Sequence, residues 1–196
     1  MPRKVLIRLE SLMINFLDNH YAVIAYIIFI GLLIICSFSD IKFRIIPNTI
    51  VLGIIFIGFS LNLLTSQGVG SQSAVLGFSA GFLIMLPCYI FASLGAGDVK
   101  LMAAIGSVVG LDKVLDVIVD SIFVMFFISL IFIVVKGDLF KLLYRFKVFI
   151  VSLVLQGVIY YQRPTHKEAA AEMLPMAPAV MLATFYVLYR LLAARV

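Results

Sequence analysis

The sequence predicts an all-α, polytopic membrane protein with six transmembrane helices and an N-terminal amphipathic helix. Of its 196 residues, 64% are hydrophobic and only 13% are charged, against about 45–50% and about 25% in soluble domains. So few polar side chains cannot cover the surface of a soluble globule, and a disordered chain would need low hydrophobicity. The length fits a single membrane-embedded domain over residues 1–196.

Apolar runs set the expected spans, because about 20 apolar residues are needed to cross the hydrocarbon core. Residues 1–20 mix charged with apolar positions and predict an interfacial amphipathic helix. The fourth run is short, so its first turn must be buried in protein or face water. The expected spans are residues 21–39, 47–64, 74–93, 98–110, 114–135 and 173–192.

Glycine pairs at i,i+4 mark where two of these spans approach a neighbour. Gly77 and Gly81 form such a pair in the third span, and Gly106 and Gly110 form another in the fourth. Small residues at this spacing let helix backbones come close together in a membrane. We therefore expect close helix packing at both pairs.

The basic loops predict the orientation, since cytoplasmic loops of membrane proteins carry an excess of Lys and Arg. This rule also accounts for the net charge of +5, and no basic groove with interleaved aromatics suggests a nucleic-acid partner. The N-terminus is then outside, and residues 148–161 lie along the cytoplasmic face or re-enter from it. The basic, cytoplasmic loops are 41–46, 136–147 and 162–168, and the other loops are 65–73 and 111–113.

The cysteines and histidines do not predict a metal site. Cys36 and Cys88 lie inside apolar runs, the chain has no CxxC, and both are interpreted as buried small hydrophobes. His20 and His166 have no neighbour at metal-ligand spacing. We expect neither a metal nor a cofactor.

Two carboxylates at membrane depth are the first candidates for chemistry, because ionisable groups there are costly. Asp40 closes the first span and Asp98 lies at the break between the third and fourth, so alternation places both on the cytoplasmic side. A close pair of carboxylates shares one proton, as in an aspartic protease. The ionised member takes a proton from water while the protonated member polarises the scissile carbonyl.

The residues before Asp98 fit the same chemistry. Gly95 and Gly97 allow backbone conformations closed to other residues, and they let an extended substrate strand approach closely. The helix that starts after Asp98 offers unpaired N–H groups near the site.

Other residues leave alternatives open. Asp116 and Asp120, one turn apart and on a face with Asp112, form an interfacial acidic face or a proton or cation site. Pro175 and Pro178 mark a helix start or an irregular segment that lines a cavity. The basic residues at the cytoplasmic side set the topology and contact lipid headgroups, or they tune the aspartate pair; these are Lys42, Arg44 and Lys100.

Three segments together carry a resemblance to a known family. Residues 40–48 combine an Asp, basic residues and an Ile-Pro-Asn run, and residues 95–100 read Gly-Ala-Gly-Asp-Val-Lys, a GxGD-VK box. Residues 173–178 hold a Pro-x-x-Pro stretch. In this order the segments resemble the type IV prepilin peptidases, bacterial aspartic proteases of the inner membrane. The resemblance covers residues 21–192.

The resemblance implies an activity and its residues. Asp40 and Asp98 would be the catalytic pair of one membrane-embedded peptidase domain. The substrate would be a prepilin or pseudopilin, whose basic leader is cleaved after a Gly at the cytoplasmic face. Membrane lipids would be the other partners. The positions expected to shape the loops and the substrate site are Pro47, Asn48, Gly95, Gly97, Lys100, Pro175 and Pro178.

The chain departs from the long members of that family, which add a cytoplasmic domain with paired CxxC motifs and N-methylate the new terminus. Only six residues separate Asp40 from Pro47, which resembles the short branch of tight-adherence, or Flp-type, pili, and we expect no methyltransferase activity. Presenilin-like and signal-peptide peptidases share GxGD but have Tyr where Ser39 stands. The rival hypothesis is a small transporter or channel subunit with Asp98 and Asp120 as proton sites.

Overall fold

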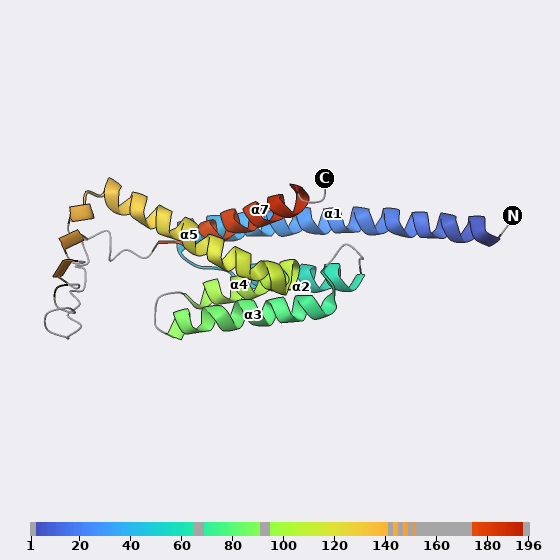
Figure 1. Ribbon diagram of the computed structural model, residues 1–196, viewed down its shortest axis with the longest axis horizontal. Coiled ribbons are helices and arrows are strands. Elements are labelled where there is room, and N and C mark those ends of the chain that lie inside the picture. The colour runs from blue at the N-terminus through green and yellow to red at the C-terminus, as the bar shows by residue number, and fades with distance from the viewer. Residues whose placement is uncertain are drawn as a thin grey trace. The chain divides into compact units, whose positions relative to one another are not determined.

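The computed structural model describes residues 3–64, 69–90, 95–140, 143–144, 147–148, 151 and 174–193. Within these residues the regular structure is α-helical with no strand, so the predicted all-α class is confirmed. Three segments are long and apolar enough to cross a membrane: His20–Phe43, Ser71–Ile90 and Leu111–Val135. The helices are α1 (Arg3–Phe43), α2 (Asn48–Leu64), α3 (Ser71–Ile90), α4 (Ala96–Val109), α5 (Leu111–Val135) and α7 (Ala177–Ala193) (Figure 1).

The chain divides into two compact units. One comprises residues 1–122 and 175–196 and contains both candidate aspartates; the other comprises residues 123–174. In the second unit α5 continues to Val135, and Gly137 adopts a positive φ of 75° in the turn that follows. The expected cytoplasmic segment 162–168 lies outside the described residues, as does all but a small part of 148–161.

The N-terminal residues belong to one long helix. The sequence predicts an interfacial helix over residues 1–20 that leads into the first span, and α1 runs without a break for 41 residues, of which His20–Phe43 are the candidate span. Residues 3–30 contain no Pro or Gly, so nothing in this part of the sequence interrupts the helix. At its other end α1 continues beyond Ser39 and ends at Phe43. The next residue, Arg44, has a φ of 53°, and its N–H donates to the Asp40 carbonyl at 2.9 Å.

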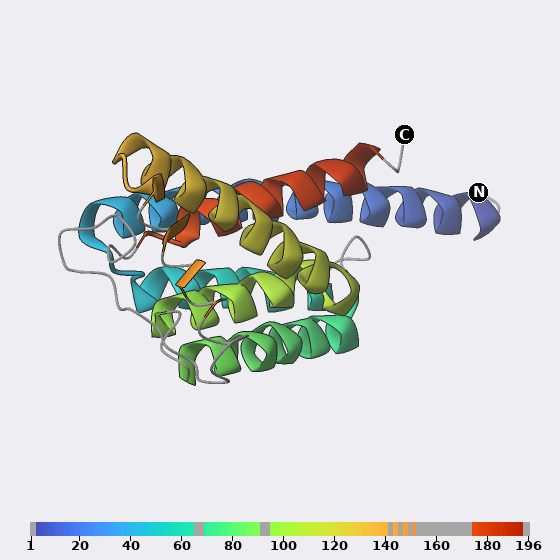
Figure 2. The same cartoon turned by 60° about the vertical axis from the view of Figure 1, so that its left-hand side comes forward.

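The short helix α4 lies at the centre of the first unit. It packs against α3 and α2 and also touches α7 (Figure 2). α4 has 14 residues, and every residue from Leu101 to Val109 is buried. A helix that is apolar on all sides is stable only inside a protein or a membrane. The first turn, which the sequence predicts to be buried in protein or to face water, is exposed at Ala96, half-buried at Gly97 and Asp98, and buried at Val99.

Glycines allow α3 and α4 to approach this closely. A Cβ atom at Gly106 would lie 2.6 Å from the carbonyl carbon of Gly77, and one at Gly81 would lie 2.7 Å from the carbonyl oxygen of Met102. A Cβ at Gly77 would lie 2.6 Å from the carbonyl carbon of Gly110. The predicted role of both glycine pairs is confirmed.

A buried polar contact joins α2 to α4. The Asn62 side-chain amide donates to the Gly58 carbonyl at 2.7 Å and to the Ser107 carbonyl at 3.0 Å. Gly58 leaves the room that Ser107 needs, since a Cβ there would overlap the Ser107 hydroxyl. Hydrogen bonds of this kind between membrane helices contribute about 0.6 kcal/mol on average.

The glycine contact between α3 and α4 can be tested by stability. We expect Gly106→Ala to lower the free energy of unfolding by about 1–3 kcal/mol, because its Cβ meets the backbone of α3 and the helices must separate. Thermal unfolding of the purified protein in detergent measures the change.

Gly31→Ala is the matched control. A Cβ at Gly31 has no atom within 4 Å, so this change should raise stability by up to about 1 kcal/mol through helix propensity. Equal effects of the two substitutions would contradict the close packing at Gly106.

Candidate active site

Asp40 lies in the last turn of α1 and is only 7% exposed. Its Oδ2 accepts a hydrogen bond of 2.9 Å from the backbone N–H of Ala177, the first residue of α7. The first N–H groups of a helix have no partner within the helix, and this end carries partial positive charge. The carboxylate of Asp40 therefore serves as an acceptor at the start of a second helix.

Asp98 is the third residue of α4 and is half-buried. Its Oδ2 accepts a hydrogen bond of 3.1 Å from the backbone N–H of Gly95, the residue that caps α4. An acid at this position commonly reaches back to the capping N–H. Both candidate carboxylates are thus held by one backbone N–H at a helix start.

The structure brings the two carboxylates into one neighbourhood. Asp40 and Asp98 are close enough to interact electrostatically with each other, and each also interacts electrostatically with the thiol of Cys36. Cys36 is fully buried one turn before Asp40 on α1. Charges interact more strongly in a partly buried place than in water, so the two carboxylates influence each other.

A hydrogen bond also joins the two sequence segments that carry these aspartates. The Lys100 ammonium donates to the side-chain oxygen of Asn48 at 3.2 Å. Asn48 begins α2, directly after Pro47, whose carbonyl accepts the N–H groups of Ile50 and Val51 at 3.1 and 3.3 Å. Pro47, Asn48 and Lys100 therefore hold the start of α2 beside the start of α4.

The two glycines before Asp98 act through close packing. The sequence predicts unusual backbone conformations for them, but Gly95 is extended at φ −78° and Gly97 is not among the positive-φ residues. A Cβ at Gly97 would lie 3.0 Å from the Cβ of Ile46, and one at Gly95 would lie 3.2 Å from Oδ2 of Asp98. The expectation that these glycines adopt unusual backbone conformations is therefore wrong. Gly97 leaves room for Ile46 in the loop before α2, and Gly95 leaves room for the Asp98 carboxylate.

The Pro-x-x-Pro stretch forms a helix start, which settles the alternative left open by the sequence. The Met176 carbonyl accepts the N–H groups of Ala179 and Val180 at 3.0 and 3.1 Å. Pro178 is thus the second residue of α7, where a missing N–H is tolerated. Ala177 is a site residue that the sequence does not single out, because it acts through its backbone; the flanking prolines are the one available signal.

Comparison with known proteins agrees with this arrangement. A family model described as "Type IV leader peptidase family" matches residues 27–137, more than half of the chain and both aspartates. The chain belongs to this family. A curated "Prepilin leader peptidase/N-methyltransferase" from Bacillus subtilis (strain 168) is 39% identical over 87 residues, which are 43% of this chain and 34% of that relative. No solved structure matches the chain significantly.

The other pair of acidic candidates in this leader peptidase family member, Asp116 and Asp120, lies on α5. The Lys113 ammonium is 3.5 Å from the Asp116 carboxylate, which supports an interfacial ion pair. Asp120 has one buried carboxylate oxygen without a hydrogen-bond partner among the described residues. Among all the residues that the structure describes, no three His, Cys, Asp or Glu residues are placed to hold a metal ion.

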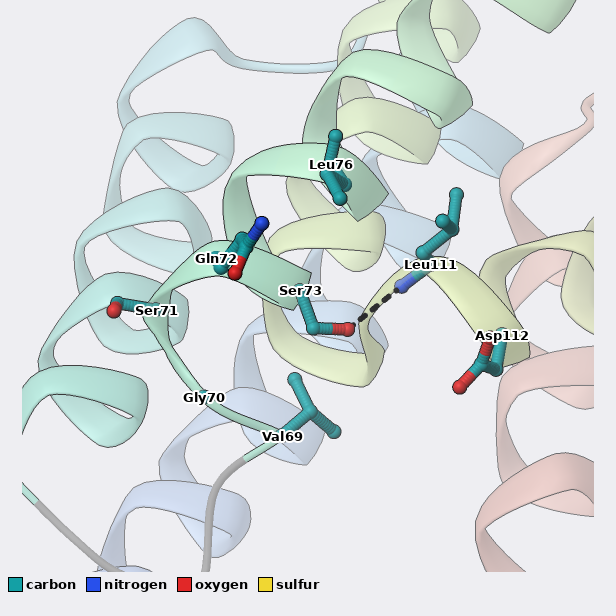
Figure 3. A pocket seen from close by; sticks show the side chains of 8 residues that line it. All are labelled: Val69, Gly70, Ser71, Gln72, Ser73, Leu76, Leu111 and Asp112. Carbon is teal, nitrogen blue, oxygen red and sulfur yellow. Dashed lines mark hydrogen bonds between the residues drawn. The ribbon is translucent and has the colours of Figure 1, made fainter.

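A hollow of about 430 Å³ is lined by residues at the starts of α3 and α5, and Figure 3 shows its lining side chains. Leu111 follows the end of α4, whereas Asp98 lies at its start. Ser73 and Leu111 close one side of it, with the Leu111 N–H donating to the Ser73 hydroxyl at 3.3 Å. Asp112 is the one charged residue in its lining. The hollow is therefore separate from the candidate active site in this family member. Its lining residues are Val69, Gly70, Ser71, Gln72, Ser73, Leu76, Leu111 and Asp112.

Proposed function

We propose that this protein is a membrane-embedded aspartic endopeptidase that removes the basic leader of a type IV prepilin or pseudopilin. Membership of the leader peptidase family supports the reaction class. The observation that carries the proposal is the pair of carboxylates from α1 and α4, within electrostatic range and each fixed by a helix-start N–H. Cleavage would follow a Gly at the cytoplasmic face of the bacterial inner membrane.

The two aspartates would divide the chemistry between them. Sharing one proton, the ionised carboxylate removes a proton from a water molecule as its oxygen attacks the scissile carbonyl. The protonated carboxyl group donates a hydrogen bond to the carbonyl oxygen, where negative charge develops. Collapse of the tetrahedral intermediate breaks the C–N bond, and the leaving amine takes up a proton.

We further propose peptidase activity without N-methylation, on a substrate of the Flp type. The name of the Bacillus relative includes a methyltransferase, but the match covers 34% of that relative. This sequence has no CxxC pair and only six residues between Asp40 and Pro47. These features support the short branch of the family.

The second candidate function is a small transporter or channel subunit. Asp120 favours it, since a buried carboxylate oxygen without a partner is a typical proton site in a membrane helix. The paired and hydrogen-bonded Asp40 and Asp98 favour the peptidase. The two candidates differ in which aspartates are essential.

The peptidase mechanism requires both Asp40 and Asp98. We expect Asp40→Asn and Asp98→Asn each to lower leader cleavage by roughly a thousandfold or more, because one ionised and one protonated carboxyl group are needed. The double variant should be no worse than either single one, since the pair acts as a unit. Co-expression with candidate prepilins, scored by leader removal, measures this.

Asp116→Asn and Asp120→Asn are the controls and should retain most of the activity. Wild-type cleavage by Asp98→Asn would refute the aspartic mechanism. No leader removal by the wild type, together with a proton flux that Asp120→Asn abolishes, would instead favour the transporter hypothesis.

The close contact of Gly97 with Ile46 predicts a second effect on cleavage. In Gly97→Ala the new Cβ must displace Ile46 or the first turn of α4 by a few tenths of an ångström. Because a misplacement of about 1 Å can cost about a hundredfold in rate, we expect about a tenfold slower single-turnover cleavage. Ala96→Gly, at an exposed neighbour, should stay within about twofold; equal rates for Gly97→Ala and wild type would remove any role for this glycine.

The proposed orientation can be tested by cysteine labelling. With the two native cysteines replaced by alanine, a cysteine at Phe140 should resist a membrane-impermeant reagent applied outside intact spheroplasts. A cysteine at Gly68 should react, because its loop is not basic and is expected outside. Labelling at position 140 from outside would overturn the six-span orientation.

A further inference from the structure

We propose that the start of α7 belongs to the active site, with the backbone N–H of Ala177 positioning Asp40 for catalysis. This role rests on the proposed aspartic mechanism, and it adds a third helix to the active site formed by α1 and α4. Ala177 is a positioning residue, because it acts through the carboxylate of Asp40.

The geometry of the contact carries the proposal. The Ala177 N–H donates to Oδ2 of Asp40 at 2.9 Å, between residues 137 positions apart in the chain, and both residues are buried. Hydrogen bonds from backbone N–H to a carboxylate are charge-assisted and about twice as strong as neutral ones. With one oxygen held in this way, the carboxylate group has a fixed orientation.

The prolines explain why Ala177 is the donor. Within residues 175–178 only Met176 and Ala177 carry a backbone N–H, because Pro175 and Pro178 have none. The helix begins at Ala177, so its N–H has no acceptor inside α7. The Pro-x-x-Pro stretch therefore directs one N–H toward Asp40 and keeps the number of competing donors low.

Packing of α7 makes this donor rigid. α7 lies along α1 in both views (Figures 1 and 2), and the buried side chains of its first two turns include Val180 and Ala183. Met176, directly before the helix, is also buried. The position of Asp40 thus depends on how the first two turns of α7 are packed, and a small displacement of a reacting group slows a reaction strongly.

Ala177→Pro tests the proposal, because proline lacks the N–H and is well tolerated at the first position of a helix. We expect kcat for cleavage of a purified prepilin to fall by roughly ten- to a hundredfold, with KM within about twofold. Replacement of Ala177 by lactate, which exchanges the N–H for an ester oxygen without adding a ring, should give the same change.

Val187→Ala is the control for packing, since it weakens the contact of α7 with its neighbours but leaves the Ala177 N–H in place. It should lower the unfolding temperature and keep kcat within about twofold. Wild-type kcat in both the proline and the lactate variants would overturn the proposal. So would an equal loss of kcat in Val187→Ala at matched loss of stability.

The same assay separates this inference from the proposed function. If Asp40→Asn and Asp98→Asn keep their activity, the aspartic mechanism itself fails. If both are inactive while the two Ala177 variants cleave at the wild-type rate, the mechanism stands and only the role of α7 fails.

Discussion

A carboxylate at membrane depth must find hydrogen-bond donors inside the protein, and in this chain the starts of helices supply them. Asp40 takes its donor from α7 and Asp98 takes its donor from the residue that caps α4. Both carboxylates therefore contact the start of a helix, which offers unpaired N–H groups and partial positive charge. This need for donors explains why the proposed catalytic pair lies at the ends of helices and not along their apolar middle.

The depth of Asp98 follows from how α4 is packed. Because α4 is buried on every side from Leu101 onward, its position is set by its neighbours. The glycine contacts with α3 and the Asn62 contact with α2 lie toward its C-terminal end, and the Lys100–Asn48 hydrogen bond lies at its start. Substitutions two or more turns away from Asp98 can therefore move the carboxylate, although they touch no reacting group.

Much of this could be predicted from the sequence, because apolar run length, charge and small-residue spacing each have a direct physical cause. Alternation of spans was enough to place Asp40 and Asp98 on one side, and the glycine pairs predicted the contact between α3 and α4. The sequence predicts a helix over residues 1–20 that leads into the first span, and α1 is continuous through both, since a change from mixed to apolar composition does not by itself end a helix. The Ala177 donor could not be predicted, because every residue except proline has a backbone N–H and the residue type does not show which one will act as a donor.

The two aspartates differ in what fixes them. The donor to Asp98 is three residues away in the same segment, so this contact forms with the helix itself. The donor to Asp40 comes from α7, which lies outside residues 27–137, the part of the chain that the family model matches. The matched region thus contains both carboxylates but only one of their two donors. It follows that both residues of the proposed catalytic pair are encoded within that region, while the geometry of the pair also depends on a helix beyond it.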